Sequence, residues 1–147
     1  MPARGVAAPV FALLLVFCGV QNMALASDVP NPRTVEVGPP LRCDLIESIV
    51  AAPQDFFIID ARSPSEYDEK HVDTAVNVPY DSLEYFGDAL PADKDANIIT
   101  YCRSGGRATV LKALLHDLGY TRINVVPGSQ MDRADKTRLS FRCGDPG

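Results

Sequence analysis

The stretch "NIITYCRSGGRAT", residues 97–109, decides how the chain folds. It starts with an apolar run of strand length that ends at Cys102. Two arginines and two glycines follow, and then apolar residues at helical spacing. This order predicts a buried parallel strand that passes through a glycine-rich turn into a helix. Functional sites in open parallel sheets lie at the C-terminal ends of strands, so Cys102 is the first candidate site residue.

Strands and helices alternate along the rest of the sequence. The predicted strands are residues 55–60, 75–79, 97–101 and 122–126, with a short edge strand at Thr34–Val37. The predicted helices are residues 41–52, a helix that starts at Pro64 with Ser63 as its N-cap, residues 81–90, a helix from 107 that ends before Gly119, and a final surface helix within 129–141. This alternation predicts one α/β domain with a mainly parallel central sheet and helices on both faces.

The first 26 residues have the pattern of a secretory signal peptide. Val10–Val20 is an apolar stretch of eleven residues, and Ala24-Leu25-Ala26 is a small-x-small cleavage site. A membrane-spanning helix needs about 20 apolar residues, which disfavours the alternative of an uncleaved anchor. We therefore expect cleavage after Ala26 and a periplasmic or secreted protein. Residues 27–40, rich in proline, then form a linker with the edge strand, and residues 41–147 form the domain.

Composition and charge restrict the classes of partner. The 147 residues suffice for one domain with a sizeable core. The formal net charge is −5 and becomes −6 when residues 1–26, which hold Arg4 and no acidic residue, are removed. An acidic chain is a poor ligand for nucleic acid or an anionic membrane surface. We expect a monomer that acts on small molecules and binds neither nucleic acid nor, after cleavage, a membrane.

Three of the four cysteines follow the predicted cleavage site. An odd number in an oxidising compartment leaves one thiol without a partner. Cys43 and Cys143 stand near the two ends of the domain, and a disulfide between them would close a loop of about 100 residues, worth up to ~4–5 kcal/mol. The alternative is two unpaired surface thiols. In either case Cys102 is the cysteine left over.

The turn after Cys102 has the composition of an anion-binding loop. Glycines allow positive φ and let successive N–H groups point into one concavity, and the following helix contributes the positive end of its dipole. Two arginines add permanent charge. These features favour the thiolate over the thiol and would also bind a small oxyanion. The alternative is an inert buried cysteine before an ordinary turn. The candidate nucleophile is thus Cys102, and the candidate binding residues are Arg103, Ser104, Gly105, Gly106 and Arg107.

The segment "YCRSGGRA" resembles the active-site loop of rhodanese-like sulfurtransferases, with Cys102 at the persulfide-forming cysteine. The upstream segment "IIDARSPSEYDEKHVDTAVNVP" is similar to a second motif of this family. The matching residues are Asp60, Arg62, Glu66, Tyr67, His71, Ala75, Asn77 and Pro79. The resemblance extends from Val35 to Gly128 and implies a single rhodanese-like domain of the exported type. Departures at Lys70, Thr74 and "PGSQMD", which lacks the family's Trp, affect local loop geometry and substrate preference.

The spacing between Cys102 and Arg107 separates related chemistries. Phosphatases with related folds use Cys-x5-Arg, whereas this loop is Cys-x4-Arg and leaves room for an outer sulfur atom. The resemblance therefore implies transfer of a sulfane sulfur from thiosulfate or a similar anionic donor, through a Cys102 persulfide, to cyanide or a thiol. It implies no metal or cofactor. One alternative is a persulfide carrier or polysulfide-binding module that serves a partner protein. A phosphatase or arsenate reductase is disfavoured by the loop length.

The remaining motif residues are expected to support the loop. Asp60 and Arg62 predict a salt bridge behind it, with Glu66 as a possible third member. Arg107 either binds the substrate anion or braces the loop through backbone carbonyls, because arginine suits both roles. His71 is expected to make a structural hydrogen bond, since transfer of a sulfane sulfur needs no general base. The side chains expected in the core are Tyr67, Phe86 and Tyr101, and His116 is expected at the surface.

Overall fold

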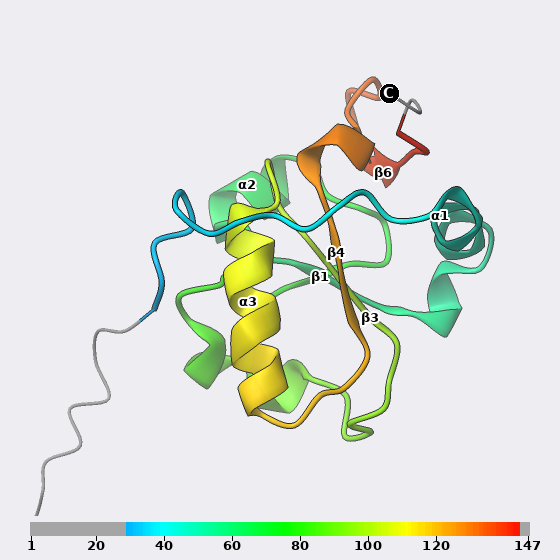
Figure 1. The fold of residues 1–147 in the computed structure, drawn as a ribbon. Coiled ribbons are helices and arrows are strands. Elements are labelled where there is room, and N and C mark those ends of the chain that lie inside the picture. The colour runs from blue at the N-terminus through cyan, green and yellow to red at the C-terminus, as the bar shows by residue number, and fades with distance from the viewer. Residues whose placement is uncertain (1–28, 145–147) are drawn as a thin grey trace, which may run out of the picture.

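A computed structural model describes residues 29–144, so the predicted signal peptide lies outside the described residues. Its centre is a four-stranded parallel sheet with the strand order β2-β1-β3-β4 (Figure 1). The strands are β1 (Phe57–Asp60), β2 (Val76–Asn77), β3 (Ile98–Tyr101) and β4 (Ile123–Val126). This architecture confirms the predicted α/β fold.

The register of the sheet brings two motif turns together. Asp60, the last residue of β1, lies opposite Tyr101, the last residue of β3. Tyr101 in turn lies opposite Val126 at the end of β4. The turns that follow β1, β3 and β4 therefore meet at one edge of the sheet, which is where parallel sheets place their sites.

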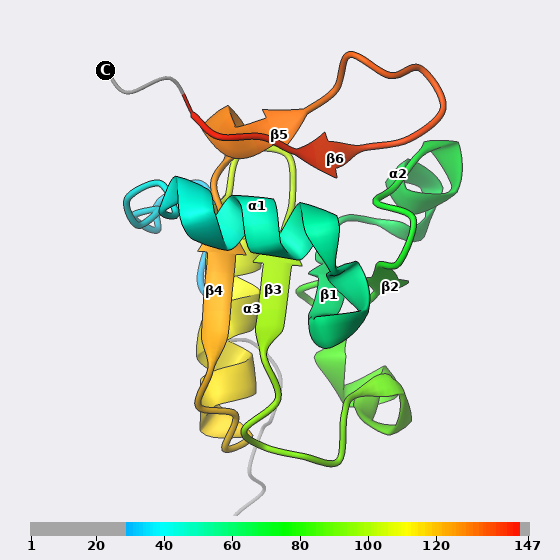
Figure 2. The same cartoon turned by 90° about the vertical axis from the view of Figure 1, so that its right-hand side faces the viewer.

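Helices cover both faces of the sheet, as predicted. Helix α1 (Cys43–Ala51) packs on one face and α3 (Gly106–Asp117) on the other, which Figure 2 shows with α1 in front of the strands and α3 behind them. Side chains of β3 alternate between the two cores: Ile99 and Tyr101 join the core under α1, whereas Ile98 joins the core under α3. The same alternation places Cys102 on the α3 side.

Short-range signals set the ends of two helices. At the start of α2 (Pro64–Glu69) the Ser63 side chain accepts a hydrogen bond from the Glu66 N–H at 3.3 Å, and the Glu66 carboxylate accepts one from the Ser63 N–H at 3.2 Å. This is the capping box that the sequence predicts. Gly119, beyond the end of α3, has a φ of 91°, the left-handed conformation that glycine adopts readily after a helix.

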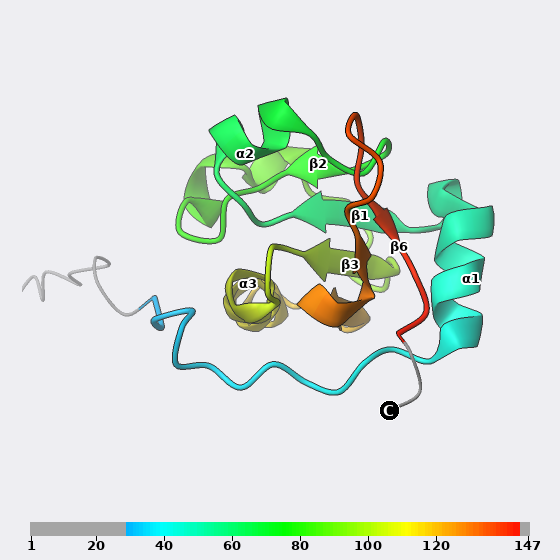
Figure 3. The ribbon, with the colours of Figure 1, turned by 90° about the horizontal axis from the view of Figure 1, so that it is seen from above.

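The predicted edge strand at Thr34–Val37 is wrong. The segment instead makes a turn over residues 32–34 and then runs in an extended form without a strand partner. Figure 3 shows it passing along the outside of α3 towards α1. Prolines at positions 32, 39 and 40 flank the segment and lack the N–H that a sheet ladder needs, so a strand here could not continue at either end.

The predicted helix over residues 81–90 is also wrong. It is replaced by two 3-10 helices, η2 (Leu83–Tyr85) and η3 (Gly87–Ala89). Gly87 is the first residue of η3 and lies inside the predicted helix, where glycine is unfavourable, so a single continuous helix is disfavoured there.

The last part of the described chain forms a hairpin instead of the predicted surface helix. A 3-10 helix, η4 (Gly128–Gln130), leads into β5 (Met131–Asp132), which pairs antiparallel with β6 (Ser140–Phe141). The Asp132 side chain accepts a hydrogen bond from the Ala134 N–H at 2.9 Å and so favours a turn over a helix. Met131 and Phe141 face each other across the hairpin and are both buried in the core under α1.

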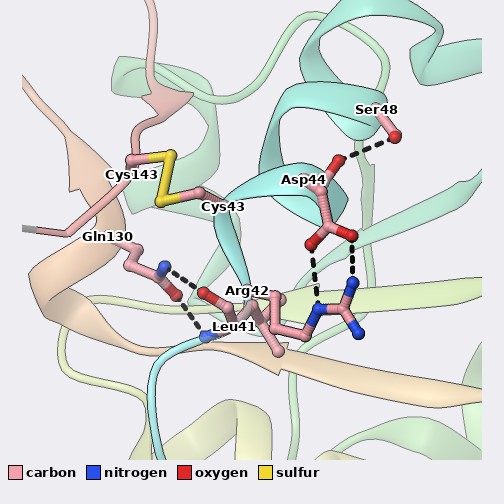
Figure 4. Close-up of a disulfide and its surroundings, with 7 residues drawn as sticks. All are labelled: Leu41, Arg42, Cys43, Asp44, Ser48, Gln130 and Cys143. Atoms are coloured by element: carbon pink, nitrogen blue, oxygen red, sulfur yellow. Dashed lines mark hydrogen bonds and ion pairs between the residues drawn. A yellow bond between two sulfur atoms is a disulfide. The ribbon is translucent and has the colours of Figure 1, made fainter.

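A disulfide joins Cys43, the first residue of α1, to Cys143, just after β6, as Figure 4 shows. The two Cα atoms are 5.1 Å apart. Next to it, the Gln130 side chain accepts a hydrogen bond from the Leu41 N–H at 2.7 Å and donates one to the Leu41 carbonyl at 2.8 Å. The start of the domain is thus attached to the hairpin twice. Among residues 29–144, no helix has the length and apolar character needed to cross a membrane.

Candidate active site

Cys102 lies directly after β3, at the entrance to the turn that precedes α3. Its side chain is buried, with 1% exposed, and it is the free cysteine of the described residues. The Gly105 N–H donates a hydrogen bond to Cys102 Sγ at 3.1 Å. Gly105 has a φ of 111°, which only glycine adopts without strain, so this residue lets the turn close around the sulfur.

The carbonyls on the outer side of the cysteine loop (residues 102–107) point away from the sulfur. The Arg103 carbonyl accepts a hydrogen bond from the Arg133 guanidinium, and the Ser104 carbonyl accepts one from the Gly128 N–H at 3.1 Å. Arg133 also donates to the Gly128 carbonyl at 3.3 Å. The segment after β4 therefore holds two successive peptide units of the loop from outside.

The first turn of α3 holds the third peptide unit. The Gly105 carbonyl accepts hydrogen bonds from the Thr109 N–H at 2.8 Å and from the Thr109 hydroxyl at 2.9 Å. In a planar trans peptide the C=O and the next N–H point in opposite directions. Outward carbonyls at 103, 104 and 105 consequently turn the N–H groups of Ser104, Gly105 and Gly106 inward. The result is the N–H concavity that the sequence predicts around Cys102.

Arg107 is anchored by Glu66 across the loop. Its guanidinium donates to both Glu66 carboxylate oxygens, at 2.5 and 3.0 Å. This contact is the main reason that the pKa of Glu66 falls from 4.5 to about 2. The pKa of Arg107 is raised, first by the hydrogen bond to Glu66 and to a smaller extent by the neighbouring Cys102. Glu66 thus pairs with Arg107 and not with the Asp60–Arg62 pair, which corrects its expected grouping.

Asp60 and Arg62 form a buried ion pair behind the loop, as predicted. Arg62 Nη2 lies 2.6 Å from Asp60 Oδ2 and Arg62 Nε lies 2.9 Å from Asp60 Oδ1. The Tyr101 hydroxyl donates to the same Asp60 Oδ2 at 2.8 Å. Burial, and then the charge of Asp60, raise the pKa of Tyr101 well above its usual range, so the phenol stays a neutral donor. Because Tyr101 precedes Cys102, this network holds the strand end from which the loop starts.

Two further motif residues bond to backbone carbonyls, Asn77 to those in the turn after β1 and His71 to one in α2. The Asn77 side chain donates to the Asp60 carbonyl at 3.1 Å and to the Arg62 carbonyl at 2.9 Å. His71 Nδ1 makes a 2.8 Å hydrogen bond to the Tyr67 carbonyl, and the two rings stack with centroids 3.8 Å apart. His71 therefore has the structural hydrogen bond that we expected.

A cleft of about 600 Å³ opens over the cysteine loop. Its lining residues are Asn31, Pro32, Arg33, Tyr80, Arg103, Ser104 and Arg107. A second cleft of about 520 Å³ shares Tyr80 and Arg107 with the first, so the two adjoin at these side chains. A larger groove of about 970 Å³, which includes His116, lies between the N-terminal segment and α3, and none of its lining residues belongs to the cysteine loop.

Sequence reasoning missed the residues that hold the loop from outside. Gly128 has room for no side chain, because a Cβ there would lie 2.7 Å from the Arg103 carbonyl oxygen. A glycine within an otherwise polar turn is the sequence signal that could have indicated this close approach of two backbone segments. Arg133 and Arg33 are exposed arginines in loops, and nothing in their sequence surroundings distinguishes them from solvated surface residues.

Known proteins resemble this chain in sequence and fold. The chain is 34% identical over 71 residues to thiosulfate sulfurtransferase PspE of Escherichia coli, covering 48% of this chain and 67% of PspE. It is 29% identical over 115 residues to the tRNA uridine(34) hydroxylase of Sodalis glossinidius, covering 76% of this chain but 32% of that protein. Among solved structures, human single-domain sulfurtransferase TSTD1 superposes with a TM-score of 0.51 at 19% identity, over 62% of this chain and 90% of that one.

The family model for the rhodanese-like domain matches residues 44–131. This range contains the sheet, the cysteine loop and the Asp60–Arg62 network, and it ends just before Arg133. The family match, the fold and the loop around Cys102 agree, and the chain belongs to the rhodanese-like domain family.

Proposed function

We propose that the protein is a sulfurtransferase that moves a sulfane sulfur from thiosulfate, or a similar anionic donor, to cyanide or a thiol. The supporting observation is the free Cys102 inside a loop whose outer carbonyls are all bound away from the sulfur. The Gly105 N–H, at 3.1 Å from Sγ, is one donor of the resulting concavity. Such preorganised donors stabilise an anion without reorganising during the reaction.

In the first half-reaction the Cys102 thiolate attacks the outer sulfur of thiosulfate. A new S–S bond forms at Sγ, the S–S bond of the donor breaks, and its electron pair leaves with sulfite. The product is a persulfide anion on Cys102. The inward N–H groups of Ser104 and Gly106 lie in the same loop and are suited to bind its terminal sulfur.

In the second half-reaction a nucleophile removes the outer sulfur. Cyanide attacks it, the Sγ–S bond breaks, and its electron pair returns to Cys102 as the thiolate while thiocyanate leaves. A thiol acceptor reacts in the same way and keeps the sulfur as a persulfide. This sequence is covalent, ping-pong catalysis, and it needs no external oxidant or reductant.

The two loop arginines have different roles, one in binding the donor and one in supporting the loop. Arg107 is held by Glu66 at 2.5 and 3.0 Å and lies next to Cys102, so it supplies charge at the sulfur from a fixed position. Arg103 is exposed and lines the cleft, and no ion pair among the described residues occupies it. We assign the donor's sulfonate group to Arg103 and loop bracing with local charge to Arg107.

The test is a thiocyanate assay with purified protein, thiosulfate and cyanide, followed by intact-protein mass spectrometry after thiosulfate alone. Wild type should turn over and gain the mass of one sulfur atom, and Cys102→Ser should lose both. Turnover that is absent while the adduct forms would favour a persulfide carrier. If wild type forms no adduct with thiosulfate or polysulfide, both sulfur-transfer functions are wrong.

We further propose that the protein is exported after cleavage at Ala26 and acts as a monomer. The Cys43–Cys143 disulfide supports export, because such bonds persist in oxidising compartments. N-terminal sequencing of protein from the extracytoplasmic fraction should start at Ser27, and size-exclusion chromatography should give the mass of one chain. Recovery of the chain from the cytoplasm with Met1 still present would contradict export.

A further inference from the structure

The N-terminal segment 31–37 lies directly on the cysteine loop, although it precedes the family match at 44–131. A Cβ on Gly106 would lie 2.0 Å from the Pro32 carbonyl oxygen. A Cβ on Gly105 would lie 2.6 Å from a methyl group of Val37. The two loop glycines are therefore needed both for the N–H concavity and for the close approach of this segment, which forms one wall of the cleft.

Local hydrogen bonds hold Arg33 at this wall. The Asn31 side chain accepts from the Arg33 N–H at 3.0 Å, and the Asn31 carbonyl accepts from both the N–H and the hydroxyl of Thr34 at 3.0 Å. Asparagine turns of this kind fix the backbone of a short loop. Arg33 therefore stands on a defined turn beside the cleft instead of on a loose tail.

The cleft is basic in an otherwise acidic chain. Arg33, Arg103 and Arg107 line it, and none of the lining residues is acidic. Glu66 balances Arg107, but no ion pair among the described residues balances Arg33 or Arg103. The net charge of the whole chain is −5. A local concentration of positive charge at the reactive sulfur selects anionic ligands.

The cleft is also larger than thiosulfate requires. Its volume of about 600 Å³ lies within the range of about 300–1,000 Å³ typical of sites for organic ligands, whereas thiosulfate has five heavy atoms. Arg103 and Arg107 belong to the loop that encloses the sulfur, and Arg33 belongs to the N-terminal segment that packs on this loop. A ligand that reaches all three must extend from the cysteine loop to this segment.

We propose that Arg33 is a specificity-determining residue that binds a carboxylate of an organic persulfide, R–S–SH, whose terminal sulfur is transferred to Cys102. This inference rests on the proposed sulfurtransferase function and names a substrate class for it. The Cys102 thiolate bonds to the terminal sulfur and the S–S bond of the donor breaks. The electron pair leaves with R–S⁻, which takes the proton of the terminal sulfur, so that R–SH departs and Cys102 carries the persulfide anion.

The experiment compares a donor that has free carboxylates with one in which they are esterified: glutathione persulfide and the persulfide of glutathione diethyl ester. Wild type should have a lower KM for the free acid. Arg33→Gln should raise that KM about three- to fivefold, the range of an exposed charged contact, with kcat and the KM of the ester unchanged. Arg122→Gln is the matched control, because Arg122 is an exposed arginine that precedes β4, at the opposite end of the sheet from the loop.

A second variant tests the turn without removing charge. Asn31→Ala removes the acceptor of the Arg33 N–H, so its preference for the acid over the ester should fall between those of wild type and Arg33→Gln. Equal KM values for acid and ester in wild type, or equal effects of Arg33→Gln and Arg122→Gln, would overturn the proposal. The mass adduct on Cys102 after thiosulfate reports separately on sulfur transfer itself, so the two failures are distinguishable.

Discussion

The cysteine loop has two supports, and they differ in almost every physical respect. The inner support is Asp60, Arg62 and Tyr101, which are buried and come from strand ends. The outer support is Gly128 and Arg133, which come from the segment after β4 and hold the loop carbonyls of residues 103 and 104. The inner support fixes where the loop starts, and the outer support fixes which way its peptide groups point.

This difference separates stability from catalysis. A buried ion pair that loses one member leaves an uncompensated charge in the core, which destabilises the fold. An exposed arginine on a backbone carbonyl contributes little to the free energy of unfolding. It does act on the direction of the N–H groups that would stabilise a persulfide, so its loss should affect the reaction more than the fold.

Breaking the inner support should have the largest effect. Asp60→Asn removes the charge that faces the buried Arg62, and we expect the free energy of unfolding to fall by ~3–5 kcal/mol. Chemical denaturation followed by circular dichroism measures this change. Asp73→Asn is the control, since Asp73 pairs with Arg138 at the surface, where an ion pair is worth at most ~1 kcal/mol. Equal effects of the two variants would refute the assignment of Asp60 as a core support.

Removing the disulfide should come next. Changing Cys43 and Cys143 together to Ser removes a disulfide between two residues that are 100 positions apart in the sequence. Disulfides typically contribute ~2–4 kcal/mol to the free energy of unfolding. Denaturation with and without reductant should show this loss in wild type and no reductant effect in the double variant. Thiocyanate formation well below the unfolding transition should stay within about twofold, because neither cysteine is among the residues that line the cleft. A larger loss of activity in the folded variant would place the disulfide within the site.

The outer support is tested by Arg133→Ala, with Arg133→Lys as the conservative variant. We expect kcat for thiocyanate formation to fall about tenfold, less than the 10²–10³ caused by losing a direct anion donor. KM and the free energy of unfolding should change little, and Lys should restore part of kcat by donating to the Arg103 carbonyl. Arg138→Ala, in the same hairpin connection, is the control. A loss of stability without a loss of kcat would show that Arg133 only holds the hairpin.

The smallest effect should appear at Glu66, as a dependence on pH. The folded state holds the pKa of Glu66 at about 2 against an ordinary 4.5, so the carboxylate stabilises the fold fully above pH 4.5. This contribution is lost as the pH falls from 4.5 towards 2. Glu66→Gln should therefore be less stable than wild type at neutral pH, by less than ~1 kcal/mol for this partly exposed pair, and the two should converge at low pH. A stability gap that does not shrink as the pH falls from 4.5 to 2 would contradict the pairing with Arg107.

Sequence reasoning succeeded where local patterns determine structure. Continuous apolar runs identified the strands, the Ser63 capping box located the start of α2, and glycine and proline marked turns. It failed at residues 81–90 and 129–141, where amphipathic or polar spacing suggested helices. There a central glycine and aspartate side chains that bond to nearby N–H groups changed the backbone. Such short segments have few residues to average over, so one or two specific contacts decide their form.

Local patterns along the sequence established the parallel sheet, the position of Cys102 at a strand end and the four-residue spacing to Arg107. The pairing of Cys43 with Cys143 was one of two alternatives, and the structure shows the disulfide. The established features depend on neighbours along the chain. The folded structure was needed to show that Glu66 pairs with Arg107, that Arg133 bonds to the loop, and that Arg33 borders the cleft. Each of these contacts joins segments that approach one another only because strand ends and loops converge at one edge of the sheet. Their energies come from distance and burial, which no local pattern encodes.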